Sequence, residues 1–425
     1  MSAWVIAGGR VLDPATGLDE RSDIWIADGH IAAIGAPPAE FPAHERIDAS
    51  GRVVCPGLVD LCARLREPGE THKGTIASET RAAAAGGITT VCCPPDTVPA
   101  IDSPATVEFV RQRAVDAGYA HVRPMGALTR GLEGEYLAPM RALIAAGCVA
   151  LGQAERSVRD TQVLRAALDY AATHDFLVLL PPLDPWIATG CAAEGALASR
   201  LGLSSIPVSA ETAELGRILA LVADTGARVH VGRLSSAAAV EQIARARADG
   251  LPVSADVAAH QLHLTDSALR GLDARVHVRP PLRSAHDRDA LREAVAAGVI
   301  EAICSDHQPH ESDAKRAPFA ASAPGVSALE TLLPLVLTFA EETDCGLATA
   351  LARVTAGPAA LLGLHAGTLT PGAPADLCLF DPQQEWTLEG AAMVSRGRNT
   401  PFEGNPLRGR VDRVLLAGEP LLTDA

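Results

Sequence analysis

The sequence predicts an α/β protein in which a (β/α)8 TIM-type barrel is joined to a small β-sandwich domain built from both termini. Three observations point to this fold. The chain has 425 residues, which suits a barrel of about 250 residues or more with a smaller addition. Its central part alternates short β-branched runs with helical stretches of about a dozen residues, the pattern of βα units in a parallel sheet. Both ends alternate apolar and polar residues between turns, so we expect residues 1–52 and 366–425 to form the β domain and residues 53–365 the barrel.

The predicted β domain consists of short apolar segments separated by turns. Gly8-Gly9 divides the first two segments, and Asp28-Gly29 between two apolar runs is a strong hairpin signal. Near the other end of the chain, Gly418 marks a further turn. The strands that we expect in this domain are Trp4–Ile6, Arg10–Leu12, Asp23–Ile26, Ile31–Ile34, Asp376–Phe380 and Val411–Leu416.

The predicted barrel contains eight βα units, and the chemistry of such barrels takes place at the C-terminal ends of the strands. Its expected strands are Val53–Leu61, Thr89–Cys93, His121–Gly126, Val149–Gln153, Phe176–Leu180, Arg228–Gly232, Val253–Val257 and Glu301–Ser305. The expected helices include Thr75–Ala85, Pro104–Ala117, Val158–Thr173, Ala210–Asp224, Ala237–Ala248 and Asp287–Ala297.

Composition excludes several classes of protein. With 48% hydrophobic and 20% charged residues, the chain can bury a core and is not disordered. The longest apolar runs fall far short of the roughly 20 residues that span a bilayer, and no secretory leader is recognised, so we expect a cytoplasmic protein without a membrane partner. The net charge of −15 argues against binding to nucleic acid. Nine cysteines, an odd number in a long chain, predict reduced thiols.

Several segments closely resemble the dihydroorotases of the amidohydrolase superfamily, along nearly the whole chain. The matching segments are PGLVDL at 56–61, LREPGETHKGTIASET at 65–80, AGGITTV at 85–91, DTVPAIDSP at 96–104, RPPLR at 279–283, SDHQPH at 305–310, GVSALETLLPLVL at 325–337, ADLCLFDP at 375–382 and NTPFEGNPLRG at 399–409.

The resemblance implies hydrolysis of a cyclic amide with one or two divalent metals. By this resemblance, the metal ligands of the family are a His-x-His pair after strand 1, a carboxylate or carboxylated lysine after strand 4, and histidines after strands 5 and 6. An aspartate after strand 8 is both a ligand and the general base. The aspartate alone is retained here, as Asp306. The other positions hold Cys62, Arg64, Gln153, Pro181 and Arg233.

These replacements predict that the metal chemistry of the family is lost. Arginine keeps its proton in proteins, so it offers no lone pair and repels a dication. The only lysines, Lys73 and Lys315, fall in predicted loops, so a carboxylated lysine at a strand end is excluded as well. We therefore expect no zinc and no other cofactor.

The substrate-binding positions implied by the resemblance are only partly retained. Arg66 stands where the family binds the substrate carboxylate, and His310 stands at a second substrate-contacting position. Asp96 and Arg279 replace two expected asparagines. We interpret Arg66 and His310 as residues that now support the surrounding loops.

Among the relatives are catalytically inactive dihydroorotase homologues that partner aspartate transcarbamoylase. The resemblance therefore implies a pseudoenzyme of pyrimidine biosynthesis, a homo-oligomer within a hetero-oligomer that contains the catalytic chain of that transferase. Two alternatives remain open. One is an active cyclic amidohydrolase with a shifted metal site, and the other is a non-catalytic sensor of dihydroorotate. The first would use Asp60, His230, Asp306 and His307, and the second Arg66, His310 and Arg283.

Asp306 leads to a structural prediction. Without a metal ion, its buried carboxylate needs another counter-charge, because an unpaired buried charge costs several kcal/mol. Arg64 and Arg233 follow strands 1 and 6 and point into the same barrel mouth. We therefore expect a salt bridge between Asp306 and at least one of these arginines, and an apolar strand-5 side made by Pro181, Pro182 and Leu183.

Overall fold

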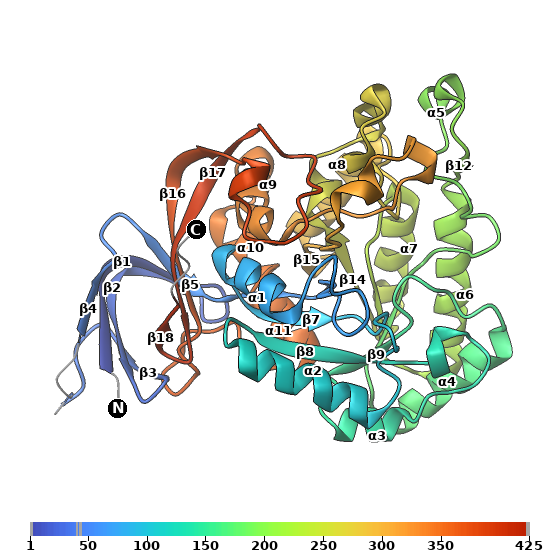
Figure 1. Ribbon diagram of the computed structural model, residues 1–425. Helices are drawn as coiled ribbons and strands as arrows, with labels where there is room; N and C mark the ends of the chain where they lie inside the picture. The colour runs from blue at the N-terminus through green and yellow to red at the C-terminus, as the bar shows by residue number, and fades with distance from the viewer. Residues whose placement is uncertain (1–2, 40, 42–44, 422–425) are drawn as a thin grey trace.

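The computed structural model describes residues 3–39, 41 and 45–421 and shows the predicted fold. A parallel barrel forms the larger part, and a sheet made from both ends of the chain lies beside it (Figure 1). The terminal sheet has the strand order β18-β17-β16-β5-β1-β2-β3, with β4 paired to β1. Its strands are β1 (Ala3–Asp13), β2 (Leu18–Ala27), β3 (His30–Ile34), β4 (Glu45–Asp48), β5 (Val53–Pro56), β16 (Leu377–Thr387), β17 (Pro406–Leu416) and β18 (Glu419–Pro420).

The two ends of the chain are held together through β5. This strand pairs in parallel with β1 on one side and antiparallel with β16 on the other. Side chains from both ends, such as Ile24, Ile26, Leu377 and Leu415, then meet in one buried cluster. The β domain is therefore stabilised by contacts between segments that lie more than 300 residues apart in the sequence.

Two predicted strand boundaries were wrong. Gly8-Gly9 does not end a strand, because β1 continues through it with an irregularity in its pairing to β2 between Ile6 and Gly9. The predicted strand Val53–Leu61 is divided at Gly57, so that its first half belongs to the terminal sheet and its second half to the barrel. The alternation of apolar and polar residues along a strand cannot reveal that the strand passes from one sheet to another, because both halves of this segment are buried.

The barrel contains eight parallel strands in the order β15-β14-β13-β10-β9-β8-β7-β6. The ring closes beyond the ends of β15 and β6, where Ala63 and His307 form a bridge and the Ser305 N–H donates to Asp60 over 2.8 Å. The strands are β6 (Leu58–Asp60), β7 (Ile88–Cys93), β8 (His121–Ala127), β9 (Ala150–Gly152), β10 (Val178–Leu180), β13 (Val229–Val231), β14 (Val253–Ala258) and β15 (Ala302–Cys304).

Several helices around the barrel begin directly after a serine or aspartate that caps the N-terminus of the helix. Ser103, Asp160 and Ser236 each accept a hydrogen bond from a backbone N–H in the first turn of the helix that follows. Glycines in the left-handed conformation, such as Gly226, end several of them. The α-helices are α1 (Ile76–Ala85), α2 (Pro104–Ala117), α3 (Met140–Ala145), α4 (Thr161–Thr173), α5 (Ala196–Leu201), α6 (Ser209–Thr225), α7 (Ala237–Ala248), α8 (Ala285–Ala297), α9 (Leu332–Thr343), α10 (Leu347–Ala352) and α11 (Ala356–Leu362).

An insertion between β10 and α6 was not predicted. It consists of β11 (Ala192–Ala193), helix α5 and β12 (Ser205–Ile206). The insertion packs against the long connection after β14 and the loop after β15, through contacts that include Cys191, Leu269 and Phe319. Short 3-10 helices occur in these and other connections: η1 (Arg130–Leu132), η2 (Ala259–Leu262), η3 (Asp266–Gly271), η4 (Ala274–Val276), η5 (Ser312–Lys315), η6 (Phe319–Ala321), η7 (Leu329–Thr331) and η8 (Gly390–Ala392).

Within the part of the chain that the structure describes, none of the helices has the length and apolar character needed to cross a bilayer.

Gly57, at the junction of the two sheets, provides a test of this packing. A Cβ atom at this position would lie 2.7 Å from Thr89 Cβ. We expect Gly57→Ala to lower the free energy of unfolding by about 1–3 kcal/mol because of this overpacking. Gly216 lies on the exposed side of α6, and a Cβ atom there would have no neighbour within 4 Å, so Gly216→Ala should instead stabilise the protein by about 0.5–1 kcal/mol. Urea denaturation measures both effects, and equal effects of the two substitutions would contradict the prediction.

Candidate functional site

Asp306 stands at the centre of a buried group of charges at the barrel mouth. It follows β15, and the two arginines that pair with it follow β6 and β13. Arg64 Nη1 and Arg233 Nη1 each lie 3.4 Å from Asp306 Oδ1. All three residues are at most 7% exposed. The predicted salt bridge is therefore present, and both arginines take part in it.

Arg64 also binds two further carboxylates. Its Nε donates to Asp96 Oδ2 over 2.7 Å, and its Nη2 lies 3.2 Å from Glu155 Oε1. The Gln308 amide connects Glu155 to Asp306, because its Nε2 lies 2.8 Å from Glu155 Oε1 and 3.2 Å from both Asp306 oxygens. We call Arg64, Arg233, Asp96, Glu155 and Asp306 the mouth cluster. Its two guanidiniums face three carboxylates, so its charges are nearly balanced by protein groups alone.

Cys62 completes the contacts of Arg233 and Asp306. Arg233 Nη1 donates to Cys62 Sγ over 3.1 Å, and Cys62 Sγ donates to Asp306 Oδ1 over 3.6 Å. Burial raises the pKa of the Cys62 thiol well above its ordinary value, although Arg233 opposes this shift. A neutral thiol fits this position, because it accepts from the guanidinium and donates to the carboxylate.

The electrostatics of the cluster follow from its burial. Burial opposes the charge on Arg64, but Asp96 and Glu155 outweigh it, so the pKa of Arg64 is raised. Burial also raises the pKa of Asp306, while Arg233 and Arg64 act to lower it. The ionised form of Asp306 thus depends on the two arginines.

The local backbone is adapted to these contacts. Asp306 has φ +47°, Arg233 has φ +62° and Arg66 has φ +63°, which is the left-handed region that side chains other than glycine rarely adopt. At Arg233 the conformation is held by its own N–H, which donates to Asp256 Oδ1 over 2.7 Å.

The residues present do not fit the metal centre that the family resemblance implies. Gln153 is buried and hydrogen-bonds with Thr129, with the two side-chain atoms 2.8 Å apart. Pro181 has no donor atom to offer a metal, and Arg64 and Arg233 carry positive charge. Across the described ranges, the structure has no group of three or more His, Cys, Asp or Glu side chains that could hold a metal ion. We therefore derive no chemical step through a metal.

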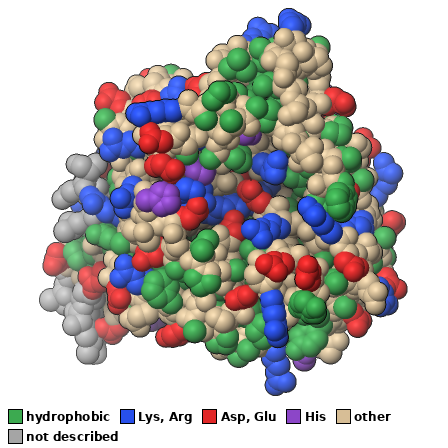
Figure 2. Space-filling model, turned by 45° about the vertical axis from the view of Figure 1, so that its right-hand side comes forward, with side chains coloured by type: hydrophobic (Ala, Val, Ile, Leu, Met, Phe, Trp, Pro, Cys, Tyr) green, Lys and Arg blue, Asp and Glu red, His purple; other side chains and the backbone are tan. Residues whose placement is uncertain are grey.

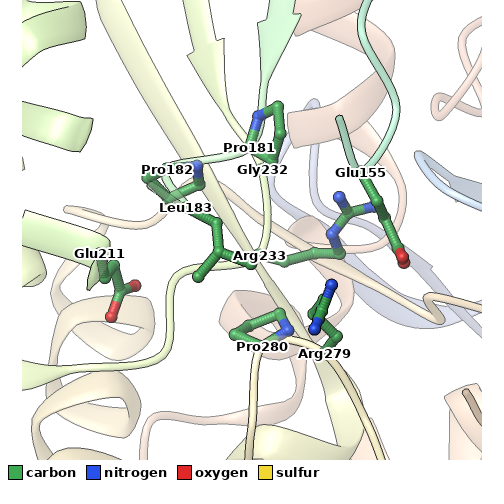
Figure 3. Close-up of a pocket in the computed structure, with 9 residues that line it drawn as sticks. All are labelled: Glu155, Pro181, Pro182, Leu183, Glu211, Gly232, Arg233, Arg279 and Pro280. Atoms are coloured by element: carbon green, nitrogen blue, oxygen red, sulfur yellow. The ribbon is translucent and has the colours of Figure 1, made fainter. Parts of the chain in front are cut away.

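The strand-5 side of the mouth is apolar. Pro181, Pro182 and Leu183 line a pocket whose opposite side carries Arg233 and Arg279 (Figure 3). Arg279 is held there by the carbonyl oxygens of Ala188 and Gly190, at 3.3 and 3.4 Å. This placement of Pro181 and its neighbours agrees with the prediction.

The four residues proposed for a shifted metal site each have other partners. His230 lies 2.9 Å from Asp256 and 2.8 Å from Ser254 through its two ring nitrogens. His307 Nε2 lies 2.9 Å from Glu79, and its Nδ1 accepts from the Ala328 N–H. Asp60 accepts from the hydroxyl and the N–H of Ser305, and burial raises its pKa to about 7. The structure thus does not bring His230, His307 and Asp60 together around Asp306.

Of the three residues proposed for a carboxylate sensor, Arg66 and His310 are in contact, with Arg66 Nη2 3.3 Å from His310 Nε2, whereas Arg283 has other partners. Arg66 Nη1 pairs with Glu70 at 2.9 Å, and its Nε donates to the Pro309 carbonyl. Arg283 Nε donates to Ser235 Oγ over 2.8 Å and lies 3.6 Å from Glu211.

His310 has a second partner besides Arg66. Its Nε2 also lies 2.9 Å from the carbonyl oxygen of Pro324. Burial, followed by the charge of Arg66, lowers the pKa of His310 to about 3, so the ring is neutral.

The sequence analysis did not identify Glu155, Asp256 and Gln308 as parts of the site. Two of them were within reach of sequence reasoning, because Glu155 follows a predicted strand end by two residues and Gln308 lies inside the SDHQPH segment. Asp256 falls inside the predicted strand Val253–Val257, and only the tertiary structure shows that it turns toward the Arg233 backbone.

Comparison with known proteins identifies the family of this chain. The model of the amidohydrolase family matches residues 53–421, which include the barrel strands and the whole mouth cluster. The chain belongs to the amidohydrolase family. Within the family it is similar to the dihydroorotase-like protein of Pseudomonas aeruginosa, at 52% identity over 97% of this chain and 98% of that protein. It is also 43% identical to the dihydroorotase of Syntrophotalea carbinolica, over 97% of both chains.

Solved structures support the same fold for this amidohydrolase-family chain. The L-hydantoinase (dihydropyrimidinase) from Arthrobacter aurescens aligns with a TM-score of 0.88 over 99% of this chain and 96% of that protein, at 24% identity. A D-hydantoinase from Thermus aligns with a TM-score of 0.84 over 98% and 94% of the two chains, at 22% identity. These likenesses concern the fold alone.

The mouth cluster predicts an asymmetry between two arginine substitutions. Arg64→Leu would leave three carboxylates facing Arg233 alone, so we expect it to lower the free energy of unfolding by about 3–5 kcal/mol. Arg10 forms a similarly close pair with Asp19 in the terminal sheet, but both side chains are about half exposed, so Arg10→Leu should cost at most about 1 kcal/mol. Urea denaturation of both variants tests this. Comparable losses would show that the buried cluster does not stabilise the barrel mouth.

Proposed function

We propose that this chain is a catalytically inactive dihydroorotase homologue, a structural subunit that assembles with aspartate transcarbamoylase in the cytoplasm and serves pyrimidine biosynthesis. In this assembly the chain would form a homo-oligomer within a hetero-oligomer. The observation that supports loss of catalysis is the double pairing of Asp306. At two positions where the family resemblance places metal ligands, Arg64 and Arg233 direct their guanidiniums at the one retained acid.

The chemical argument follows from charge and protonation. A metal-assisted hydrolase uses its aspartate to bind the ion and to accept a proton from the attacking water. Here the Asp306 carboxylate already accepts from Arg64, Arg233, Cys62 and Gln308. A dication brought to the same oxygens would have to displace two buried positive charges, and displacing them would leave those charges unpaired.

The assembly role is supported by the likeness to dihydroorotase-like relatives and by the preserved fold. A barrel that has lost its catalytic groups can still present a surface to a partner, because surface and site are separate properties of a fold. The burial of Arg64, Arg233 and Asp306 fits this view, since their pairing joins three strand ends of the barrel.

The proposal predicts the metal content and activity of the pure protein. We expect far less than one zinc ion per chain by elemental analysis and no hydrolysis of dihydroorotate above background, with a zinc-loaded dihydroorotase measured in parallel as the positive control. Arg64→His alone should not restore metal binding, because Arg233 still repels the ion and occupies its place. Stoichiometric metal together with turnover by the unaltered chain would refute the proposal.

The assembly role has a separate test in the native cell. Deletion of this chain should lower aspartate transcarbamoylase activity, and re-expression should restore it. The Asp306→Asn chain, checked for folding by circular dichroism, should restore the activity equally well, because the proposed role needs no catalytic carboxylate. A transferase that purifies without this chain and is fully active would contradict the role.

A further inference from the structure

A second cavity lies apart from the mouth cluster and has a different character. It has a volume of about 410 Å³, which is within the range of small-molecule sites. Its wall comes from η4 with the residue before it, from η5 with the two residues before it and the one after it, and from the segment that precedes β17. The residues that line it are Asp273, Arg275, His310, Glu311, Ser312, Lys315, Arg316, Arg396, Arg398 and Asn399. We call this cavity the basic pocket.

The basic pocket carries an excess of positive charge. Its five arginine and lysine side chains exceed its two carboxylates by three charges, although the whole chain has a net charge of −15. Asp273 is already engaged by Arg275, which binds both of its oxygens and also pairs with Glu403 at 2.6 Å. Arg316 likewise pairs with Asp313 at 2.9 Å. The basic side chains that remain are Lys315, Arg396 and Arg398, and Glu311 is the other carboxylate of the lining.

Three of the basic side chains lack a carboxylate partner among the described residues. Lys315 Nζ donates only to carbonyl oxygens, including those of Ala323 at 2.6 Å and Ala274 at 3.0 Å. Arg396 Nη1 donates to the carbonyl oxygen of Thr71 over 3.0 Å. The exposed guanidinium of Arg398 has no described hydrogen bond or ion pair. Burial lowers the pKa of Lys315 to about 8, so an anion bound nearby would favour its charged form.

The inner wall of the basic pocket is rigid. The Asn399 side chain donates to the Gln308 and Gly325 carbonyls and accepts from the His310 N–H and the Ser327 hydroxyl. The His310 ring is fixed by the Pro324 carbonyl, and its Nδ1 is buried without a hydrogen-bond partner. These contacts hold the side of the pocket that is formed by Asn399 and His310 in place.

We propose that the basic pocket binds a small phosphorylated molecule. A carboxylate brings a single negative charge, whereas a phosphate ester brings about two and a pyrophosphate group more, which matches the charge of Lys315, Arg396 and Arg398 better. Arginine forks bind phosphate oxygens in pairs, and the lysine supplies a compact charge. This inference does not depend on whether the chain is catalytic or on its assembly with a transferase.

Calorimetric titration of the full chain at low ionic strength tests the proposal, with inorganic pyrophosphate as the probe and with phosphate and succinate as comparison ligands. Pyrophosphate should bind more tightly than phosphate, and succinate should bind at least tenfold more weakly than pyrophosphate. Arg398→Gln should weaken pyrophosphate binding at least fivefold. Arg245→Gln removes the same charge from an exposed position on α7, where Arg245 pairs with Glu241, and should change the affinity less than twofold.

Three results would overturn the proposal: no pyrophosphate binding at millimolar concentration, equal effects of the Arg398→Gln and Arg245→Gln substitutions, or succinate binding as tightly as pyrophosphate. Because Arg398 is exposed and has no described partner, its loss should leave the fold intact, and circular dichroism spectra of the two variants check this.

Discussion

The pairing of Asp306 with Arg64 and Arg233 is the interaction on which the barrel mouth depends. Buried charges are tolerated only when partners compensate them, so the segments after β6, β7, β9, β13 and β15 must converge on one place. The strained backbone at Arg233 and Asp306 is part of the same constraint, because it turns both side chains inward. Figure 2 shows charged side chains of both signs distributed over the visible face, whereas Arg64, Arg233 and Asp306 are buried.

This cluster resembles a metal centre in one respect and differs from it in another. In both cases positive charge compensates carboxylates in a cavity of low dielectric constant. A metal ion, however, leaves a coordination position for water and raises the acidity of that water, whereas a guanidinium only donates hydrogen bonds. A scaffold of this kind can therefore keep the carboxylates at its barrel mouth compensated by guanidiniums in place of a metal ion.

Much of the fold and part of the site could be predicted from the sequence. The helix Pro104–Ala117 and the helix Ala237–Ala248 have the predicted bounds, because serine caps and Gly118 mark their ends. The salt bridge at Asp306 was predictable because strand ends of a closed barrel meet in one mouth. The division of Val53–Leu61 at Gly57 and the insertion that contains α5 were not predictable, since their partners lie far away in the sequence.

The sequence by itself determined the family and the barrel, because these depend on residue identity, spacing and periodicity. It also showed Cys62, Arg64 and Arg233 at positions where the resemblance implies metal ligands. The tertiary structure decided which charges meet. Glu155 and Asp96 join Arg64, while His230, His307 and Asp60 turn to other partners, and the basic pocket gathers residues from three distant segments. The physical reason is that electrostatic energy depends on the distances between charges in space. The loops set these distances, and the spacing of residues in the sequence does not reveal them.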